Sequence, residues 1–106
     1  MGIIAGLQEG TRNESIIVGT SSIIISPPRN TTPERKVIVV RNNSNDPLKI
    51  ITIGFGNQGP AINGAGIILK QFESFTDSAD GNYNTFQGQI NAISAIAGAT
   101  LAIMER

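Results

Sequence analysis

The sequence Phe86-Gln-Gly-Gln-Ile-Asn-Ala-Ile-Ser-Ala-Ile-Ala-Gly-Ala-Thr-Leu-Ala-Ile-Met-Glu-Arg106 decides the fold class that we predict for this chain. From position 86 to position 92, small or apolar residues alternate with Gln and Asn, as they do in a half-buried β-strand. A turn of small residues, Ala95 to Ala99, is centred on Gly98, and a second alternating run ends at Glu105. Two alternating runs joined by a short glycine-containing connection predict a β-hairpin, on which the rest of the chain would pack.

The composition favours strands over helices throughout the chain. Of its 106 residues, 40% are hydrophobic but only 5% are aromatic, and isoleucine supplies much of the apolar content. β-Branched side chains are restricted in a helix and pack well on a pleated sheet. The 12 glycines and five prolines supply turns, and the length suits one domain with a modest core.

Six further strands are predicted upstream of the C-terminal pair. They span 15–20, 22–26, 35–41, 48–55, 67–69 and 72–76. Short strands at roughly 8–12-residue spacing indicate an all-β fold, a single antiparallel β-sandwich or jelly-roll-like barrel of about eight strands. The alternative for residues 89–99 is a helix, because apolar residues there also recur at helical spacing. The predicted core consists of Ile38, Val40, Ile51, Ile53, Ile68, Phe75, Phe86, Ile90, Leu101 and Ile103.

The chain is predicted to divide into an N-terminal arm, residues 1–14, and a single β-sandwich or barrel domain, residues 15–106. The arm begins with an apolar patch and shows no clear hydrophobic period. Apolar side chains gain little on a mobile terminus, whereas a neighbouring molecule would bury them. The predicted assembly residues are therefore Ile3, Ile4 and Leu7, and the alternative is a disordered, expendable tail.

Charge and residue inventory argue against several classes of function. Eight basic and eight acidic residues give a formal net charge of zero, so no basic field exists to attract nucleic acid. The longest strongly apolar stretch is about 15 residues, against the roughly 20 that a membrane-spanning helix needs. Histidine and cysteine are absent, which removes the commonest metal ligand and general base. The sequence therefore predicts no catalysis, no cofactor, no metal and no membrane span.

Three local patterns resemble functional sites. Gly54-Phe-Gly-Asn-Gln-Gly59 matches the dinucleotide-binding pattern G-x-G-x-x-G, but the proline and glycines that follow exclude the helix that such a site needs. The acidic cluster Glu73, Asp77 and Asp80 would suit a glycan hydrolase or a calcium loop, although Asp and Asn beside Gly are ordinary turn residues. The basic residues Arg35, Lys36 and Arg41 fall on different faces of a strand, which favours a solvated edge.

The C-terminal two-thirds of the sequence carries an ordered series of short motifs. They are Arg35-x-x-Ile38-x-Val40-x-Asn42-x-Ser44, Ile50 to Gly54, Gly66-Ile-x-Leu69 with Phe72 to Phe75, Phe86-x-Gly88-x-Ile90-x-Ala92-Ile93, and Gly98-Ala-Thr-Leu-Ala-Ile-x-Glu105. In this order they resemble small β-barrel or β-sandwich structural proteins from the virions of tailed phages and related prokaryotic viruses. The abundance of Ile and Asn with few aromatic residues would suit a virus with an archaeal host.

This chain departs from the resembled pattern at two positions. Phe86 stands where the pattern often has Trp. The turn that the pattern writes as Leu-x-Pro-Gly-Glu-Ser reads Leu69-Lys-Gln-Phe-Glu-Ser74 here, without Pro-Gly. The resemblance implies no active site, so no catalytic residue is assigned from it.

The resemblance implies a structural component of a virus particle, associated with the capsid, a vertex or the tail and located in the virion. Such a component acts through symmetric assembly. The expected partners are copies of itself and other virion proteins, and the chain would be a homo-oligomer. The alternative function is a carbohydrate-binding or adhesion module, for which Tyr83 is the candidate exposed aromatic residue.

Overall fold

The computed structural model describes residues 12–29, 34–56, 60–80 and 82–106, which form eight β-strands and no helix. The strands are β1 (Arg12–Val18), β2 (Ile23–Ser26), β3 (Val37–Asn42), β4 (Ile51–Phe55), β5 (Ile67–Leu69), β6 (Ser74–Ser78), β7 (Ile90–Ser94) and β8 (Ala99–Glu105). The predicted all-β class is confirmed. The helical alternative for residues 89–99 is wrong, because β7 and the start of β8 occupy that stretch.

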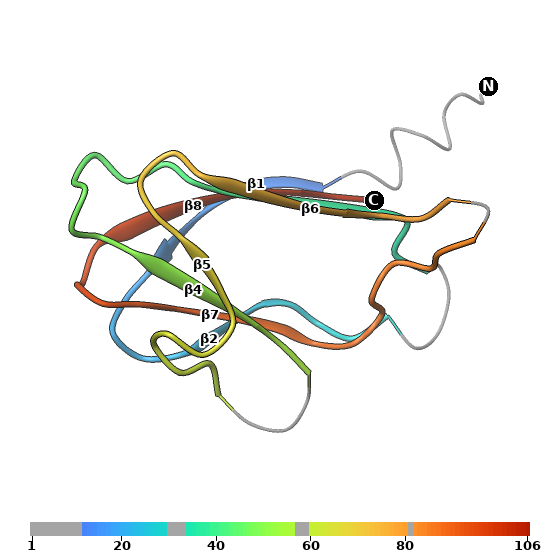
Figure 1. Cartoon of the computed structure of the whole chain (residues 1–106), viewed down its shortest axis with the longest axis horizontal. Coiled ribbons are helices and arrows are strands. Elements are labelled where there is room, and N and C mark those ends of the chain that lie inside the picture. Colours follow the sequence, from blue (N-terminus) through green and yellow to red (C-terminus); the bar gives the residue numbers. More distant parts are fainter. Residues whose placement is uncertain (1–11, 30–33, 57–59, 81) are drawn as a thin grey trace.

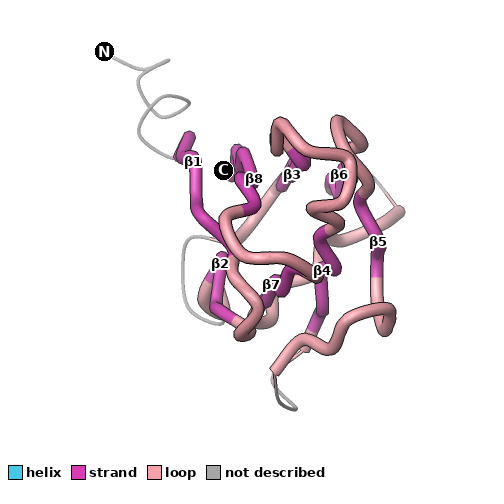
Figure 2. Tube along the Cα trace, turned by 90° about the vertical axis from the view of Figure 1, so that its left-hand side faces the viewer, coloured by secondary structure: helices cyan, strands magenta, loops and turns pink. Residues whose placement is uncertain are grey.

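The strands form two four-stranded antiparallel sheets that lie face to face (Figure 1). The order is β1-β8-β3-β6 in sheet A and β2-β7-β4-β5 in sheet B. Figure 2 shows sheet A as the upper layer and sheet B as the lower layer, with β1 and β2 on the same side of the molecule. The chain is therefore a single antiparallel β-sandwich, as predicted.

Each strand in the first half of the chain pairs with a strand in the second half. β1 pairs with β8, β2 with β7, β3 with β6 and β4 with β5. The pairs β3–β8 and β4–β7 then join these ribbons into the two sheets. As a result, every connection except the one between β4 and β5 crosses from one sheet to the other.

The two C-terminal strands are present, but they do not form the predicted hairpin. β7 lies between β2 and β4 in sheet B, whereas β8 lies between β1 and β3 in sheet A. Gly98 takes a positive φ of 84° in the connection between them, and the Ala95 amide donates to the Ile50 carbonyl at 3.0 Å. Alternation of apolar residues locates a strand and its buried face, but it does not identify the neighbouring strand. The predicted pairing is wrong for that reason.

The strand boundaries near the chain ends also differ from the sequence-based ones. β1 begins at Arg12, so residues 12–14, which the sequence analysis placed in the arm, pair with β8. β7 begins at Ile90, so residues 86–89 do not continue that strand. Ile3, Ile4 and Leu7 lie outside the described residues.

The core lies between the two sheets and is mainly aliphatic. Seven of the ten predicted core residues are buried in it: Ile38, Val40, Ile51, Ile53, Ile90, Leu101 and Ile103. Phe75 and Phe86 are partly buried against this core, and both rings make edge-to-face contacts with Phe55. Ile68 is 46% exposed, and its prediction as a core residue is wrong because Leu69 is the buried residue of β5.

A buried ion cluster holds one end of the sandwich together, and it consists of Arg12, Ser26, Arg29, Arg35 and Glu105. The Glu105 carboxylate is 1% exposed and binds Arg35 Nε at 2.8 Å and Arg12 Nη1 at 2.6 Å. Arg29 Nη2 lies 3.7 Å from the same carboxylate. The Ser26 hydroxyl donates to Glu105 and accepts from Arg35 Nη2 at 2.6 Å. Because Glu105 lies in sheet A and Ser26 in sheet B, the ion cluster connects the two layers.

Arg35 also binds backbone that lies outside the strands. Its guanidinium donates to the carbonyls of Pro27 (3.0 Å), Phe86 and Gly88 (3.3 Å). The Gln87 side chain accepts from the Arg35 amide and donates to the Arg35 carbonyl, both at 2.7 Å. These contacts hold residues 86–89 against the start of β3. The prediction of a solvated position for Arg35 is therefore wrong, because its charge is neutralised internally by Glu105.

Asn42 and Ser44 hold the opposite end of β3. The Asn42 amide group donates to the carbonyls of Lys49 (2.8 Å) and Leu69 (2.9 Å), and its Oδ1 accepts from the Ser44 amide at 3.0 Å. The Ser44 hydroxyl accepts from the Thr100 amide at 2.9 Å. Within the described ranges, no buried side-chain nitrogen or oxygen lacks a hydrogen-bond partner. The polar groups that enter the core at both ends of β3 are therefore satisfied.

Replacing Glu105 by Gln should destabilise the fold by about 3–5 kcal/mol. The substitution preserves the shape of the side chain but leaves the charges of Arg12 and Arg35 without their carboxylate. Chemical denaturation measures the loss. The matched control is Lys36→Gln, which removes an exposed ion pair with Glu34 (3.5 Å) and should change the free energy of unfolding by no more than about 1 kcal/mol. Equal losses in the two variants would contradict a structural role for the ion cluster.

The same carboxylate makes the stability dependent on pH. Burial would raise the pKa of Glu105, but hydrogen bonds from Ser26, Arg35 and Arg12 outweigh it and hold the pKa below its ordinary value. A carboxyl of this kind contributes stability above its unfolded-state pKa of about 4.3, and the contribution is lost as pH falls through the folded-state value. As the pH is lowered below about 4.3, we expect the denaturant concentration at the unfolding midpoint to decrease in the native chain. The decrease should be less steep in Glu105→Gln, which lacks this carboxyl.

Candidate interaction surface

The outer face of the central strands of sheet B is covered by residues 60–66 of the connection between β4 and β5, which begin beneath this sheet in Figure 1. Thr52, Asn91 and Ile93 alternate with core residues and so point to the outer side, yet they are only 2%, 3% and 9% exposed. Ala61 of the connection is buried, and the Gly64 amide donates to Thr52 Oγ1 at 3.1 Å. The chain therefore covers the two central strands of sheet B, whereas Ile24 (58%) and Ile68 (46%) remain exposed on its edge strands β2 and β5.

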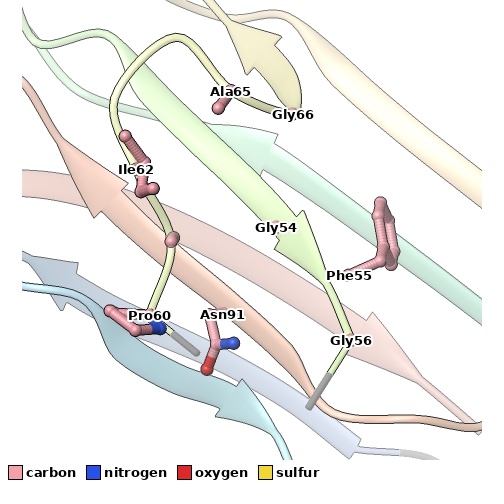
Figure 3. A pocket seen from close by; sticks show the side chains of 9 residues that line it. Gly54, Phe55, Gly56, Pro60, Ile62, Ala65, Gly66 and Asn91 are labelled. Atoms are coloured by element: carbon pink, nitrogen blue, oxygen red, sulfur yellow. The ribbon is translucent and has the colours of Figure 1, made fainter. Parts of the chain in front are cut away.

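A pocket of 520 Å3 lies between this connection and sheet B (Figure 3). It is lined by Gly54, Phe55, Gly56, Pro60, Ala61, Ile62, Ala65, Gly66 and Asn91. Asn91 supplies the single polar side chain of this lining, and its Oδ1 accepts from Gln89 Nε2 at 3.1 Å. A Cβ at Gly66 would lie 2.3 Å from the Ile53 carbonyl oxygen, so the wall of the pocket requires glycine there. The described residues of the lining include no titratable or nucleophilic side chain, and most of the surface that they offer is apolar.

The outer face of sheet A has no comparable cover among the described residues. In β3 and β8, half-buried residues alternate with buried ones, so every second side chain points away from the core. We call the outward-pointing set the sheet A face. It consists of Asn13, Ser15, Ile17, Val37, Val39, Arg41, Ser74, Thr76, Ser78, Thr100, Ala102 and Met104.

The sheet A face has an apolar centre and a polar margin. The central strands β8 and β3 contribute Ala102, Met104, Val37 and Val39, whereas the edge strands β1 and β6 contribute mostly Ser, Thr and Asn. Arg41 is the one charged residue of the face. An apolar centre with a polar rim and few charges is the composition of a protein–protein interface.

A groove of 380 Å3 crosses the sheet A face over β1, β8 and β3. Ala102 lies opposite Ser15 on one side and Arg41 on the other, and Met104 occupies the next outward position of β8. The two small side chains, Ser15 and Ala102, are flanked by the longer side chains of Arg41 and Met104, which accounts for the depression. The groove is lined by Asn13, Glu14, Ser15, Val39, Arg41, Ala102, Ile103 and Met104.

Phe72 lies beside Arg41 in a strained backbone conformation. It is the third residue of the turn Lys70–Glu73, in which the Glu73 amide donates to the Lys70 carbonyl at 3.0 Å. Its φ of 65° is the one positive value among the described non-glycine residues, and a type II turn requires it at this position. A bulky residue in this conformation costs about 1–3 kcal/mol. This is the turn at which the sequence lacks the Pro-Gly of the resembled pattern.

The Phe72 ring is 54% exposed and is contacted by Arg41. The guanidinium carbon lies 5.2 Å from the ring centroid, and Arg41 Nε donates to the Phe72 carbonyl at 3.3 Å. Exposed cation–π contacts contribute about 0.5–1 kcal/mol, which does not fully offset the backbone strain. Phe72 is therefore an exposed aromatic residue that the fold does not need for its stability, and we include it in the candidate surface.

The acidic residues that would suit a catalytic or calcium site each have a structural role. Glu73 accepts from the Lys70 amide of its own turn at 2.8 Å, and Asp80 accepts from the Asn82 amide in the same connection at 2.7 Å. Asp77 is buried in β6 and accepts from the Phe86 amide at 3.0 Å. No group of three or more acidic side chains that could hold a metal ion occurs in the described part of the chain.

Tyr83 is 51% exposed and lies in the connection between β6 and β7. A hydrogen bond to Asp77 raises the pKa of its phenol. Phe72 precedes β6 and Tyr83 follows it, so these two exposed rings lie at opposite ends of the strand and do not form one platform. Tyr83 was predicted from the sequence as an exposed aromatic residue, and its exposure is confirmed. Phe72 was not predicted to be exposed, although a phenylalanine at the usual glycine position of a turn was a signal for it.

Comparisons of the chain with protein-family models, with curated proteins and with solved structures gave no match. No helix in the described ranges is long and apolar enough to span a membrane. From the geometry described above, we define the candidate surface as the sheet A face together with the adjoining Phe72 side chain.

Phe72→Gly should leave the free energy of unfolding within about 1 kcal/mol of the native value. Glycine adopts the positive φ without strain, and this gain offsets the lost cation–π contact and the greater entropy of the unfolded chain. Thermal denaturation measures the difference. Phe75→Gly is the matched control, because it removes a partly buried ring from the same segment and should be clearly destabilising. A comparable loss in Phe72→Gly would show that Phe72 serves the fold.

Proposed function

We propose that this protein is a structural component of a virus particle, associated with the capsid, a vertex or the tail. In this proposal it acts in the virion by symmetric assembly with copies of itself and with other virion proteins, and the sheet A face is a contact surface. The observation that carries the proposal is the difference between the two sheets. The central strands of sheet B, β7 and β4, are covered by the chain itself, whereas no described residue covers the apolar centre of sheet A.

The strand pairing supports the proposal. Four ribbon pairs, β1–β8, β2–β7, β3–β6 and β4–β5, are wound into two sheets, and we assign this arrangement to the jelly-roll architecture. Jelly rolls occur in viral capsid domains, lectins and cupins, so the architecture is shared by several functions. The sequence resemblance to virion structural proteins favours the first of these classes.

The chemistry of the sheet A face also supports assembly. A partner that covers its centre buries mainly aliphatic side chains and Met104, and the charged residues that line the groove there are Arg41 and Glu14. Phe72 adds an exposed aromatic anchor at the margin, next to Arg41. Aromatic and arginine side chains contribute disproportionately to protein interfaces.

Self-association should be sensitive to a charge at the centre of this face and insensitive to one at its margin. Val39→Lys places an ammonium group at the centre and should weaken self-association roughly tenfold or more. The matched control is Thr76→Lys, which is exposed directly opposite Val39 on β6 and should retain the native oligomer. Size-exclusion chromatography with light scattering gives the masses, and thermal denaturation verifies that both variants fold. A strictly monomeric native chain that never co-purifies with virus particles would contradict the proposal.

A carbohydrate-binding or adhesion module is the second candidate function. The exposed rings of Phe72 and Tyr83 favour it, because each presents an apolar surface that a sugar ring can contact. A glycan array tests it with the native chain, Phe72→Ala and Tyr83→Ala. Glycan binding that is lost in one of these variants, with an unchanged thermal stability, would favour this function over assembly.

A further inference from the structure

We infer that the sheet A face binds residues 1–11 of a neighbouring copy of the chain. The inference rests on the proposed function, because it requires two copies to meet. It goes further by naming the segment that covers the apolar centre of sheet A. The place where this segment joins the sandwich, its composition and its charge all support the assignment.

Residues 1–11 are attached to the sheet whose outer face is uncovered. Arg12 begins β1, which is an edge strand of sheet A. Its side chain is bound to Glu105 (2.6 Å), to Glu14 (3.0 Å) and to the Ile25 carbonyl (3.0 Å), so the point of attachment is fixed. To cover its own sheet, the chain would have to reverse direction at this point. To reach the sheet of a neighbouring copy, the chain could continue in the direction of β1.

The composition and length of this segment match the sheet A face. Met1, Ile3, Ile4 and Leu7 provide apolar side chains for a face whose centre is apolar. Eleven extended residues span at most about 36–40 Å, which is enough to cross a neighbouring sheet. The chain therefore contains, within one short segment, a ligand that could cover most of the groove.

The groove offers this segment a receptive surface. Its volume of 380 Å3 is sufficient for several aliphatic side chains, and Met104 can adapt its shape to them. The two strands beneath it, β8 and β3, already pair on both sides. The segment would therefore bind through side-chain contacts on the face rather than by adding a strand at an edge.

Charge also matches between the segment and the face. Glu9 is the one charged side chain within residues 1–11. Two charged residues line the groove, Arg41 and Glu14. Glu14 is already bound by Arg12 (3.0 Å), whereas Arg41 forms no ion pair with an acidic residue in the described ranges. An exposed pair of this kind adds little affinity, but it favours one register and direction of binding.

Disulfide trapping can test the inference, because the chain contains no cysteine. One full-length protein carries Ile3→Cys, Ile4→Cys or Leu7→Cys, and a second carries Ala102→Cys or Met104→Cys. After mixing and mild oxidation, covalent dimers are measured on non-reducing gels. The matched control for the second protein is Ile24→Cys, at a position that is 58% exposed on the outer side of sheet B. A disulfide forms when the two Cα atoms can approach within about 7 Å.

We expect at least one segment–groove pair to form dimers roughly tenfold faster than the Ile24→Cys control, because docking raises the effective concentration of the two thiols. Equal rates for all pairs, or faster dimer formation with Ile24→Cys, would overturn the inference. A chain carrying both Leu7→Cys and Ala102→Cys that closes an internal disulfide as a monomer would also overturn it.

The outcome for this docking site is separable from the outcome for the proposed function. The mass of the native protein in solution reports on assembly independently of any cysteine variant. An oligomer without a preferred segment–groove pair would refute the docking site and leave the proposed function standing. A monomeric native chain would refute the proposed function itself.

Discussion

The ion pair between Arg35 and Glu105 is the interaction on which the rest of this structure depends. Glu105 ends the last strand, and Arg35 precedes β3 by two residues. Through Arg12, Ser26 and the Phe86 carbonyl, the same cluster reaches β1, β2 and the segment before β7. A buried ion pair adds little net stability compared with apolar residues of the same volume. We infer that its main contribution is to specify which strands meet at this end of the sandwich.

The ion pair is needed for this purpose because the aliphatic core by itself distinguishes poorly between alternative strand registers. The strands are rich in isoleucine and valine, and a shift of two residues along such a strand keeps the same residue types on the buried face. Arg35 lies at one end of β3 and Asn42 at the other. Each forms hydrogen bonds with only a few specific groups and in a defined geometry. Fixing both ends of a central strand fixes its register against β8 and β6.

Some of these features could be predicted from the sequence, and the reason is their periodicity. The alternation from Thr100 to Glu105 located β8 and its buried side without any knowledge of the fold. The partner of β8 depends on contacts across the whole chain, so the sequence pattern could not distinguish a hairpin from strands in two different sheets. Arg35 shows the same limitation, since a charged residue becomes a core residue only through a partner 70 positions away.

The candidate surface was even less accessible to sequence reasoning. Val39 and Met104 belong to strands whose other side is the core, and an apolar residue on either side of such a strand has the same appearance in the sequence. Only the three-dimensional arrangement shows that the β4–β5 connection covers the central strands of one sheet and that no described residue covers those of the other. Phe72 was visible as an anomaly in a turn, but its exposure and its contact with Arg41 depend on the fold.

The pairing of β1 with β8 also determines how the protein would respond to mechanical load. A force applied at Arg12 and directed along β1 acts perpendicular to the hydrogen bonds of the seven residue pairs that connect β1 to β8. β8 is held on its other side by β3, so β1 would have to slide past it as a unit, with its hydrogen bonds breaking together rather than in succession. The Arg12–Glu105 contact stands at the loaded end of this ladder. Tension along β1 is therefore resisted in shear, with all seven residue pairs of the ladder loaded together.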